Sequence, residues 1–229
     1  MKRELPKVPK VVGIRRVQMI RALQISTLLF AGFLIVTEQV LTHGYLDKVD
    51  HQIKAIKHHT FRGMSSHILL ALDDLGLRWF TATVLILISL LIGWRYKTWR
   101  PLNLSILSLL ALNGVVGVAK LLIGRTKPRL SIDQLHFGGM SYPSGHASNA
   151  IISWGLVAYL IYRYSHRGPF LGIQMAWLPI STTTAVFIVS LLRNTHWFSD
   201  LLGGVFLGGS ILVAIIAIDR WIPSERQPS

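Results

Sequence analysis

A histidine and an aspartate lie four residues apart near the end of the chain, at His196 and Asp200. At that spacing on a helix, the carboxylate lies one turn from the imidazole and can hold one ring nitrogen. Such a contact fixes the tautomer and leaves the other nitrogen free to act as a base or a nucleophile. The pair is therefore a candidate for the reactive part of a catalytic site.

A second candidate lies upstream, where Ser144, Gly145 and His146 follow Pro143 and precede an apolar segment. Ser144 is a suitable N-cap, and the free amides of a first helical turn bind phosphate groups well. Gly145 allows close approach of the backbone to an anion. His146 would then stand beside the phosphate and give a proton to the departing oxygen.

A third segment carries four cations within residues 120–129, at a point where an apolar helix is expected to end at Gly124: Lys120, Arg125, Lys127 and Arg129. Cations at the end of a membrane span often contact lipid headgroups. Four in ten residues exceed that need, and fixed cations are what a phosphoryl dianion requires. Together the three segments predict phosphoryl transfer at a membrane surface.

No carboxylate cluster suited to Mg²⁺ or Zn²⁺ accompanies these segments in the sequence, so we expect a reaction that uses no metal and no cofactor. Four histidines and two aspartates between residues 44 and 78 invite comparison with a metal site: His51, His58, His59, His67, Asp73 and Asp74. A histidine pair on an amphipathic helix is more often a solvated surface, so no metal ligands are predicted there.

The composition indicates a membrane protein, because 51% of residues are hydrophobic and only 15% are charged. The mean hydropathy is +0.47. A helical span needs ~20 apolar residues. Six segments approach or exceed this length, at about 20–42, 79–95, 102–122, 146–164, 172–192 and 200–221. We expect an all-α integral membrane bundle of six transmembrane helices.

The chain divides into a basic tail at 1–19, a single six-helix membrane domain at 20–221 and a polar tail at 222–229. The first apolar segment is too long for a signal peptide and is expected to be a retained anchor. Between the first two spans, apolar residues recur at helical spacing, which predicts short interfacial helices. Gly204 and Gly208 in the last segment predict close contact with a neighbouring helix, holding Asp200 firmly.

The distribution of lysine and arginine predicts the orientation. Fourteen lie in the two tails and the even-numbered loops, and ten lie on the opposite side. Five of those ten belong to the candidate site: Lys120, Arg125, Lys127, Arg129 and Arg193. Both termini should therefore be cytoplasmic, with the site on the periplasmic or extracellular face of the plasma membrane.

The net charge of +14 would suggest nucleic acid in a soluble protein. Here topology and the site account for much of the charge, and no basic stripe interleaved with aromatics is present, so no nucleic-acid partner is expected. The chain contains no cysteine, which excludes a thiol nucleophile and thiolate metal ligands.

The three segments resemble the motifs of the type-2 phosphatidic acid phosphatase (lipid phosphate phosphatase) superfamily, Lys-x6-Arg-Pro, Pro-Ser-Gly-His and Ser-Arg-x5-His-x3-Asp. The second is intact at 143–146. In the first, Lys127 stands where the family has arginine. In the third, Ser190 occupies the arginine position, and Arg193 lies three residues later.

The resemblance implies that His196 is the nucleophile, Asp200 its orienter and His146 the general acid. It implies phosphate binding by Lys120, Lys127, Ser144 and Gly145, and Arg193 and Arg125 are expected to supply the missing guanidinium contacts. The implied substrate is a lipid phosphate within the membrane: polyprenyl diphosphate, phosphatidylglycerol phosphate or phosphatidic acid.

Three alternatives to a hydrolase stay open at this stage. A phosphotransferase would pass the phosphoryl group to another acceptor in place of water. A weakly active member would serve as a binding scaffold, because two motif arginines are missing. A transporter is the third, although neither an inverted repeat nor paired broken helices are visible. The sequence does not determine the oligomeric state.

Overall fold

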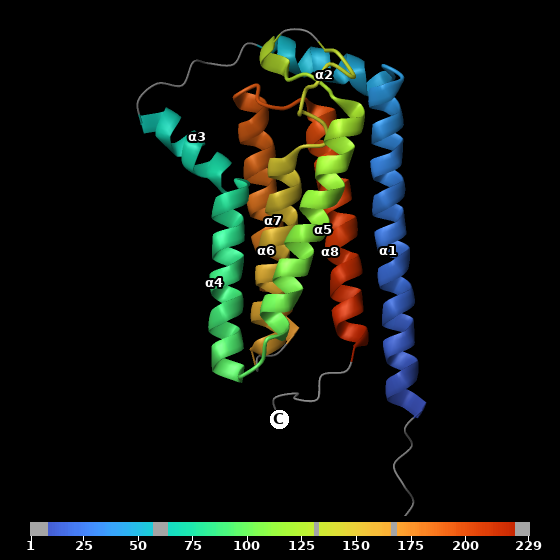
Figure 1. Cartoon of the computed structure of the whole chain (residues 1–229), viewed down its shortest axis with the longest axis vertical. Coiled ribbons are helices and arrows are strands. Elements are labelled where there is room, and N and C mark those ends of the chain that lie inside the picture. The colour runs from blue at the N-terminus through green and yellow to red at the C-terminus, as the bar shows by residue number, and fades with distance from the viewer. Residues whose placement is uncertain (1–8, 57–63, 131–132, 166–168, 223–229) are drawn as a thin grey trace, which may run out of the picture.

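The part of the chain described by the computed structural model, residues 9–56, 64–130, 133–165 and 169–222, consists of helices and their connecting loops. Figure 1 shows the long helices side by side in a bundle, with the short helix α2 lying across one end. The elements are α1 (Pro9–Leu41), α2 (Tyr45–Ala55), α3 (Met64–Asp74), α4 (Arg78–Tyr96), α5 (Arg100–Ile123), the 3₁₀ turn η1 (Pro128–Leu130), α6 (Gly145–Tyr164), α7 (Pro169–Leu192) and α8 (Phe198–Trp221).

Five of the described helices are long and apolar enough to cross a membrane: α1 from Arg16, α4, α5, α7 from Gly172, and α8. The predicted all-helical architecture is confirmed, but the expected count of six spans is not. The exception is α6, which occupies the expected segment 146–164 but carries polar residues such as Ser148, Asn149 and Ser153, all buried. Polar residues on such a helix are tolerated because they face the interior of the bundle.

Helix α6 forms the centre of the bundle and packs against α4, α7 and α8. Ile152, Leu156 and Leu160 are almost completely buried along it. The expected close approach of α8 is confirmed, because a Cβ added at Gly204 would lie only 2.6 Å from the Ser144 carbonyl oxygen. The first turn of α8, which carries Asp200, is thereby held against the first turn of α6.

Helix α1 extends beyond the predicted anchor. It begins at Pro9, so residues 9–19 of the expected tail are helical, and residues 1–8 lie outside the described residues. The helix runs along α8, where the Ser26 and Ser210 hydroxyls each donate to the other residue's main-chain carbonyl at 3.0 Å. Figure 1 shows the start of α1 and the end of α8 at the same end of the bundle.

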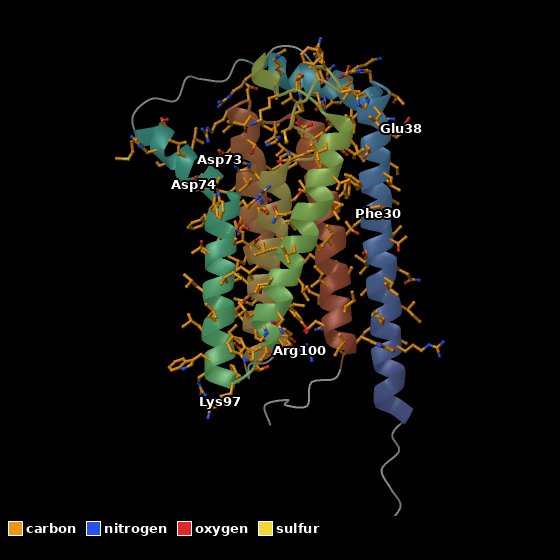
Figure 2. The ribbon with its side chains drawn as sticks, viewed as in Figure 1. Phe30, Glu38, Asp73, Asp74, Lys97 and Arg100 are labelled. Atoms are coloured by element: carbon orange, nitrogen blue, oxygen red, sulfur yellow. The ribbon has the colours of Figure 1, made fainter. Side chains whose placement is uncertain are left out.

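The predicted interfacial helices between the first two spans are α2 and α3. They lie at the end of the bundle opposite the end of α8 (Figure 1). Figure 2 shows the same division in side chains, with Glu38 and Asp73 towards one end and Lys97 and Arg100 at the other. The candidate catalytic residues gather at the end where α2 and α3 lie.

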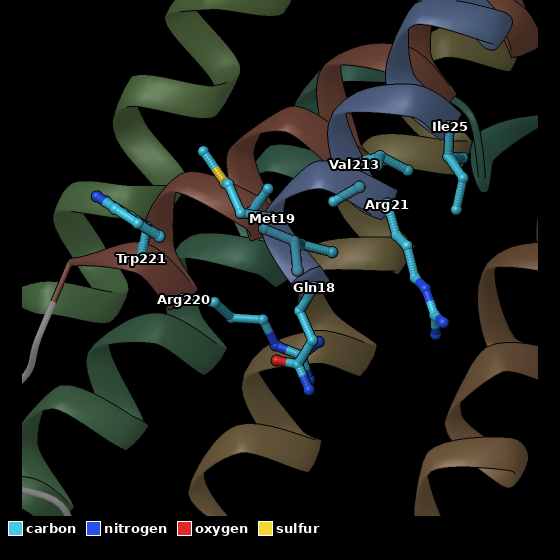
Figure 3. A pocket seen from close by; sticks show the side chains of 10 residues that line it. Gln18, Met19, Arg21, Ile25, Val213, Arg220 and Trp221 are labelled. Atoms are coloured by element: carbon cyan, nitrogen blue, oxygen red, sulfur yellow. The ribbon is translucent and has the colours of Figure 1, made fainter. Parts of the chain in front are cut away.

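At the far end of the bundle, Asp219 on α8 is only 4% exposed. Its carboxylate accepts hydrogen bonds from Arg100 Nε at 2.7 Å and from the Tyr159 hydroxyl at 2.5 Å, and Arg163 Nη1 lies 2.8 Å away. These contacts join α5, α6 and α8. A cavity of about 320 Å³ lies nearby between α1 and α8, with Gln18 and Arg220 among its lining residues (Figure 3).

Candidate active site

His196 lies in the turn before α8 and is only 6% exposed. Its Nδ1 is 3.5 Å from Oδ2 of Asp200, the third residue of α8. That same oxygen accepts hydrogen bonds from the Trp197 amide at 3.0 Å and from the Ser141 hydroxyl. Two hydrogen bonds therefore fix this oxygen of Asp200, and Nε2 of His196 is the nitrogen on the side of the ring away from the carboxylate.

The second oxygen of Asp200 contacts Arg125. The Arg125 guanidinium is 1% exposed and donates to Asp200 Oδ1 at 3.0 Å, to Asp50 Oδ2 at 2.9 Å and to Asp133 Oδ1 at 2.9 Å. It also donates to the Ser199 hydroxyl at 2.6 Å. Arg125, expected among the phosphate ligands, is instead enclosed behind the His196–Asp200 pair.

Arg125 stays charged in this position. Burial alone would lower the pKa of the guanidinium, but the hydrogen bond to Asp133 and the charges of Asp200, Asp133 and Asp50 raise it above its ordinary value. A charged guanidinium that fills its donors with carboxylates has little capacity left for a substrate phosphate. Arg125 therefore supports Asp200.

Asp50 connects the interfacial helix α2 to this cluster. Its Oδ1 accepts from the Ser199 amide at 2.8 Å and its Oδ2 from the Ser199 hydroxyl at 2.5 Å. Burial raises the pKa of Asp50, although Arg125 and Ser199 oppose the effect. Sequence reasoning missed Asp50, because nothing local marks one aspartate on an amphipathic helix as the partner of residues 149 positions away.

The second motif has the predicted capping geometry. Ser144 is the N-cap of α6, and its hydroxyl accepts from the Ala147 amide at 3.3 Å. The Ser144 amide in turn donates to the Asp200 carbonyl at 2.9 Å, which ties the start of α6 to the start of α8. The rings of His146 and His196 are neighbours, with their centroids 6.0 Å apart and their planes tilted by 56°.

Lys120 lies beside this helix start. A Cβ added at Gly145 would be 3.9 Å from Lys120 Cε, and Lys120 Nζ donates to the Met140 carbonyl. Lys127 is exposed, and its charge acts on both Lys120 and His146. The structure thus brings Lys120, Lys127, Gly145 and His146 to the same end of the bundle as His196.

Arg193 lies in the same region but has a partner that was not expected. Its Nη1 forms an ion pair with Asp73 Oδ2, on α3, and its carbonyl accepts from Arg129. Ser190, which stands where the family has arginine, is completely buried, and its hydroxyl has no hydrogen-bond partner among the described residues. The sequence signalled Arg193 but not the carboxylate that holds it.

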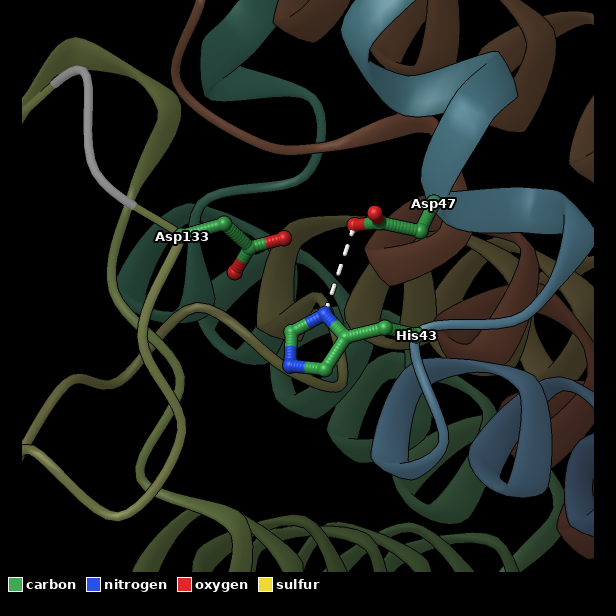
Figure 4. A group of neighbouring side chains, drawn as sticks. All are labelled: His43, Asp47 and Asp133. Atoms are coloured by element: carbon green, nitrogen blue, oxygen red, sulfur yellow. Dashed lines mark ion pairs between the residues drawn. The ribbon is translucent and has the colours of Figure 1, made fainter.

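One group of metal-type ligands occurs among the described residues, formed by His43, Asp47 and Asp133 (Figure 4). His43 Nδ1 lies 3.6 Å from Asp47 Oδ1, and Asp133 is also a partner of Arg125. The group therefore shares Asp133 with the Arg125 cluster behind His196. Of the histidines considered in the sequence, His51 contacts Trp197 with the two rings tilted by 35°, whereas His58 and His59 lie outside the described residues.

The family model of the PAP2 superfamily matches residues 101–223 of the chain. The matched stretch begins in α5 and ends just after α8, so it contains all three motif segments and more than half of the chain. The fold and the site thus define an integral membrane protein of the PAP2 type, and the chain belongs to the PAP2 superfamily.

Among individual proteins, the chain is similar to phosphatidylglycerophosphatase B of Bacillus subtilis (strain 168). The two are 24% identical over 209 residues, which cover 87% of this chain and 97% of the relative. It is also similar to the crystal structure of a transmembrane PAP2 type phosphatidylglycerolphosphate phosphatase from Bacillus subtilis. That comparison has a TM-score of 0.69 and 23% identity, covering 88% of this chain and 98% of the other. The likeness shows a shared fold over nearly the whole chain.

Proposed function

We propose that the protein is a membrane phosphatase that removes the terminal phosphate from a lipid phosphate through a phosphohistidine intermediate. The observation that carries the proposal is the arrangement of His196, buried with Nδ1 facing Asp200, opposite His146 at the start of α6. A phosphoryl group between the two rings would meet a nucleophile on one side and a proton donor on the other.

The reaction would take place in two steps. In the first, a lone pair of His196 forms a bond to phosphorus while the bond to the lipid oxygen breaks and that oxygen takes a proton from His146. In the second, water gives a proton to His146 and attacks the phosphohistidine, which releases phosphate and restores His196. The amides at the start of α6 and the charges of Lys120 and Lys127 would stabilise the equatorial oxygens.

The preferred substrate in this proposal is phosphatidylglycerol phosphate, because the relative from Bacillus subtilis is named for the hydrolysis of that lipid. Polyprenyl diphosphate and phosphatidic acid are the other substrates that the motif resemblance implies. All three place a phosphate at the membrane surface, where the α2 and α3 end of the bundle would meet it (Figure 1).

The test is phosphate release by purified protein in detergent from each of the three lipids. Wild-type protein should release phosphate, and His196→Ala should lose more than about 99% of the activity, because the nucleophile is absent. His67→Ala, an exposed histidine on α3, is the matched control and should stay fully active. Retention of several per cent of activity by His196→Ala would reject His196 as the nucleophile.

Two further measurements address the chemistry. Because the proposed steps use only side chains and backbone amides, activity should persist in excess EDTA and vanadate should inhibit, since it mimics five-coordinate phosphorus. Loss of activity in EDTA that Mg²⁺ restores would contradict a metal-independent reaction. Product analysis with an added lipid or sugar acceptor would show whether the phosphoryl group passes to that acceptor or to water, which separates the phosphotransferase from the hydrolase.

A further inference from the structure

Asp73 has an unusual environment for a carboxylate at the end of a short interfacial helix. Its side chain is only 15% exposed, and one oxygen pairs with Arg193. The other oxygen, Oδ1, is buried and has no hydrogen-bond partner among the described residues. A buried acceptor left without a partner costs free energy, so this carboxylate is held where it is by the packing around it.

That packing places the end of α3 against the start of α6. Gly76 is buried, and a Cβ added there would lie 2.8 Å from the His146 carbonyl oxygen and 3.1 Å from His146 Cβ. The Trp154 indole, two turns along α6, donates to the Leu75 carbonyl at 2.9 Å. The chain segment that follows Asp73 is therefore fixed directly against His146.

The charges that face His146 come from four parts of the chain. Burial of the ring is the largest influence and lowers the pKa of His146. His196 in the turn before α8, Lys127 in the loop after α5 and Lys120 on α5 lower it further. Asp73 on α3 is the group in this set that raises it. A general acid must carry its proton when the substrate arrives. The negative charge of Asp73 favours the protonated imidazole, which the neighbouring cations disfavour.

We propose that Asp73 is a positioning residue for the reaction, whose carboxylate favours the protonated form of His146 that gives a proton to the leaving oxygen. The role rests on the proposed phosphatase function. Asp73 touches neither the substrate nor phosphorus. Its effect passes through His146, while the ion pair with Arg193 holds the carboxylate in place.

The test compares substrates that need the proton with one that does not. In Asp73→Asn, kcat for phosphatidylglycerol phosphate, with its alkoxide leaving group, should fall about tenfold or more, because general acid catalysis supplies a factor of roughly 10²–10⁴. Hydrolysis of p-nitrophenyl phosphate, whose leaving group departs without protonation, should fall less than about threefold. The basic limb of the kcat/KM profile for the lipid should also move to lower pH.

The matched control is Asp74→Asn, because Asp74 is the exposed neighbour on the same turn. This variant should hydrolyse both substrates at the wild-type rate. Equal losses on both substrates with an unmoved basic limb would overturn the proposal and leave Asp73 as a structural partner of Arg193. If Asp73→Asn does not fold, Asp73→Ser decides instead. This smaller neutral side chain should reproduce the selective loss on the lipid, and a uniform loss would overturn the proposal.

Wild-type activity separates this proposal from the function on which it rests. If wild-type protein hydrolyses neither substrate, the phosphatase assignment fails and the role of Asp73 fails with it. If wild-type protein is active and Asp73→Asn behaves like Asp74→Asn, only the role of Asp73 is rejected.

Discussion

Arg125 donates to Asp200 at 3.0 Å, from the side of the carboxylate opposite His196. The contact joins the segment of the first motif, which contains Arg125, to the third motif, which contains Asp200. It does so by a direct hydrogen bond inside the protein. It also connects the loop after α5 to the turn before α8 that carries His196. In free-energy terms, the guanidinium compensates for burying three carboxylates: Asp50, Asp133 and Asp200.

Replacing Arg125 by alanine should therefore damage both stability and turnover. Removing one partner from a buried ion pair typically costs about 3–5 kcal/mol. We expect a clearly lower unfolding temperature for Arg125→Ala in detergent and a severe loss of kcat. Arg95→Ala is the control, because Arg95 is exposed at the other end of the bundle. Normal stability with only a raised KM would instead indicate direct phosphate binding by Arg125.

Replacing Asp50 by alanine should lower activity although the residue lies on an interfacial helix. The change leaves the buried Ser199 amide and hydroxyl without their acceptor, which costs about 1–3 kcal/mol per group. Asp47→Ala is the matched control from the same helix, since its carboxylate forms its ion pairs with the exposed His43 and His51 and none with Arg125 or Ser199 among the described residues. Equal kcat values for the two variants, measured on the lipid substrate, would show that α2 does not support the site.

Replacing Gly204 by alanine should destabilise the protein. A Cβ at this position would lie 2.6 Å from the Ser144 carbonyl oxygen, and forcing an extra methyl group into such a contact costs about 1–3 kcal/mol. Gly114→Ala on α5 meets nothing within 4 Å, so it should leave stability unchanged or raise it by up to about 1 kcal/mol. Thermal unfolding of both variants checks the prediction. Equal unfolding temperatures would contradict the tight contact between α6 and α8.

The orientation in the membrane can be tested with single cysteines, because the natural chain has none. Fourteen of the nineteen lysines and arginines outside the site lie on the side away from it, so the site should face outwards. Cysteine at position 137, in the exposed loop at the site end, should react with an impermeant reagent on intact cells. Cysteine at position 97, at the other end, should react only after permeabilisation. The reverse pattern would invert the topology.

The sequence predicted those features that follow from local patterns. Apolar segments indicated the long helices, Gly124 marked the end of α5, and Ser144 was correctly interpreted as the cap of α6. The helix expected at 146–164 is present as α6, but its status as a sixth span is not confirmed, because its buried polar residues lower its hydropathy. His196 and Asp200 were found because their spacing is short and periodic.

Two of the missed residues act across long sequence distances. Asp50 reaches Arg125 from 75 residues away, and Asp73 reaches Arg193 from 120 residues away. Asp133 lies only eight residues from Arg125, but in a loop whose path the sequence does not indicate. A carboxylate that will be buried looks the same in a sequence as one that will face water. For this reason Arg125 was assigned to the substrate, whereas its partners lie inside the protein.

Helix α8 carries a buried carboxylate near each end, Asp200 and Asp219, and both pair with arginines from segments made earlier. During synthesis, Arg125 can already meet Asp50 and Asp133, but its contact with Asp200, like that of Arg100 with Asp219, forms only when the last helix is made. A nascent chain that stops short of α8 would lack one carboxylate partner of an arginine at each end of the bundle. The last helix to be made is thus the one that joins the two ends of the bundle by charge.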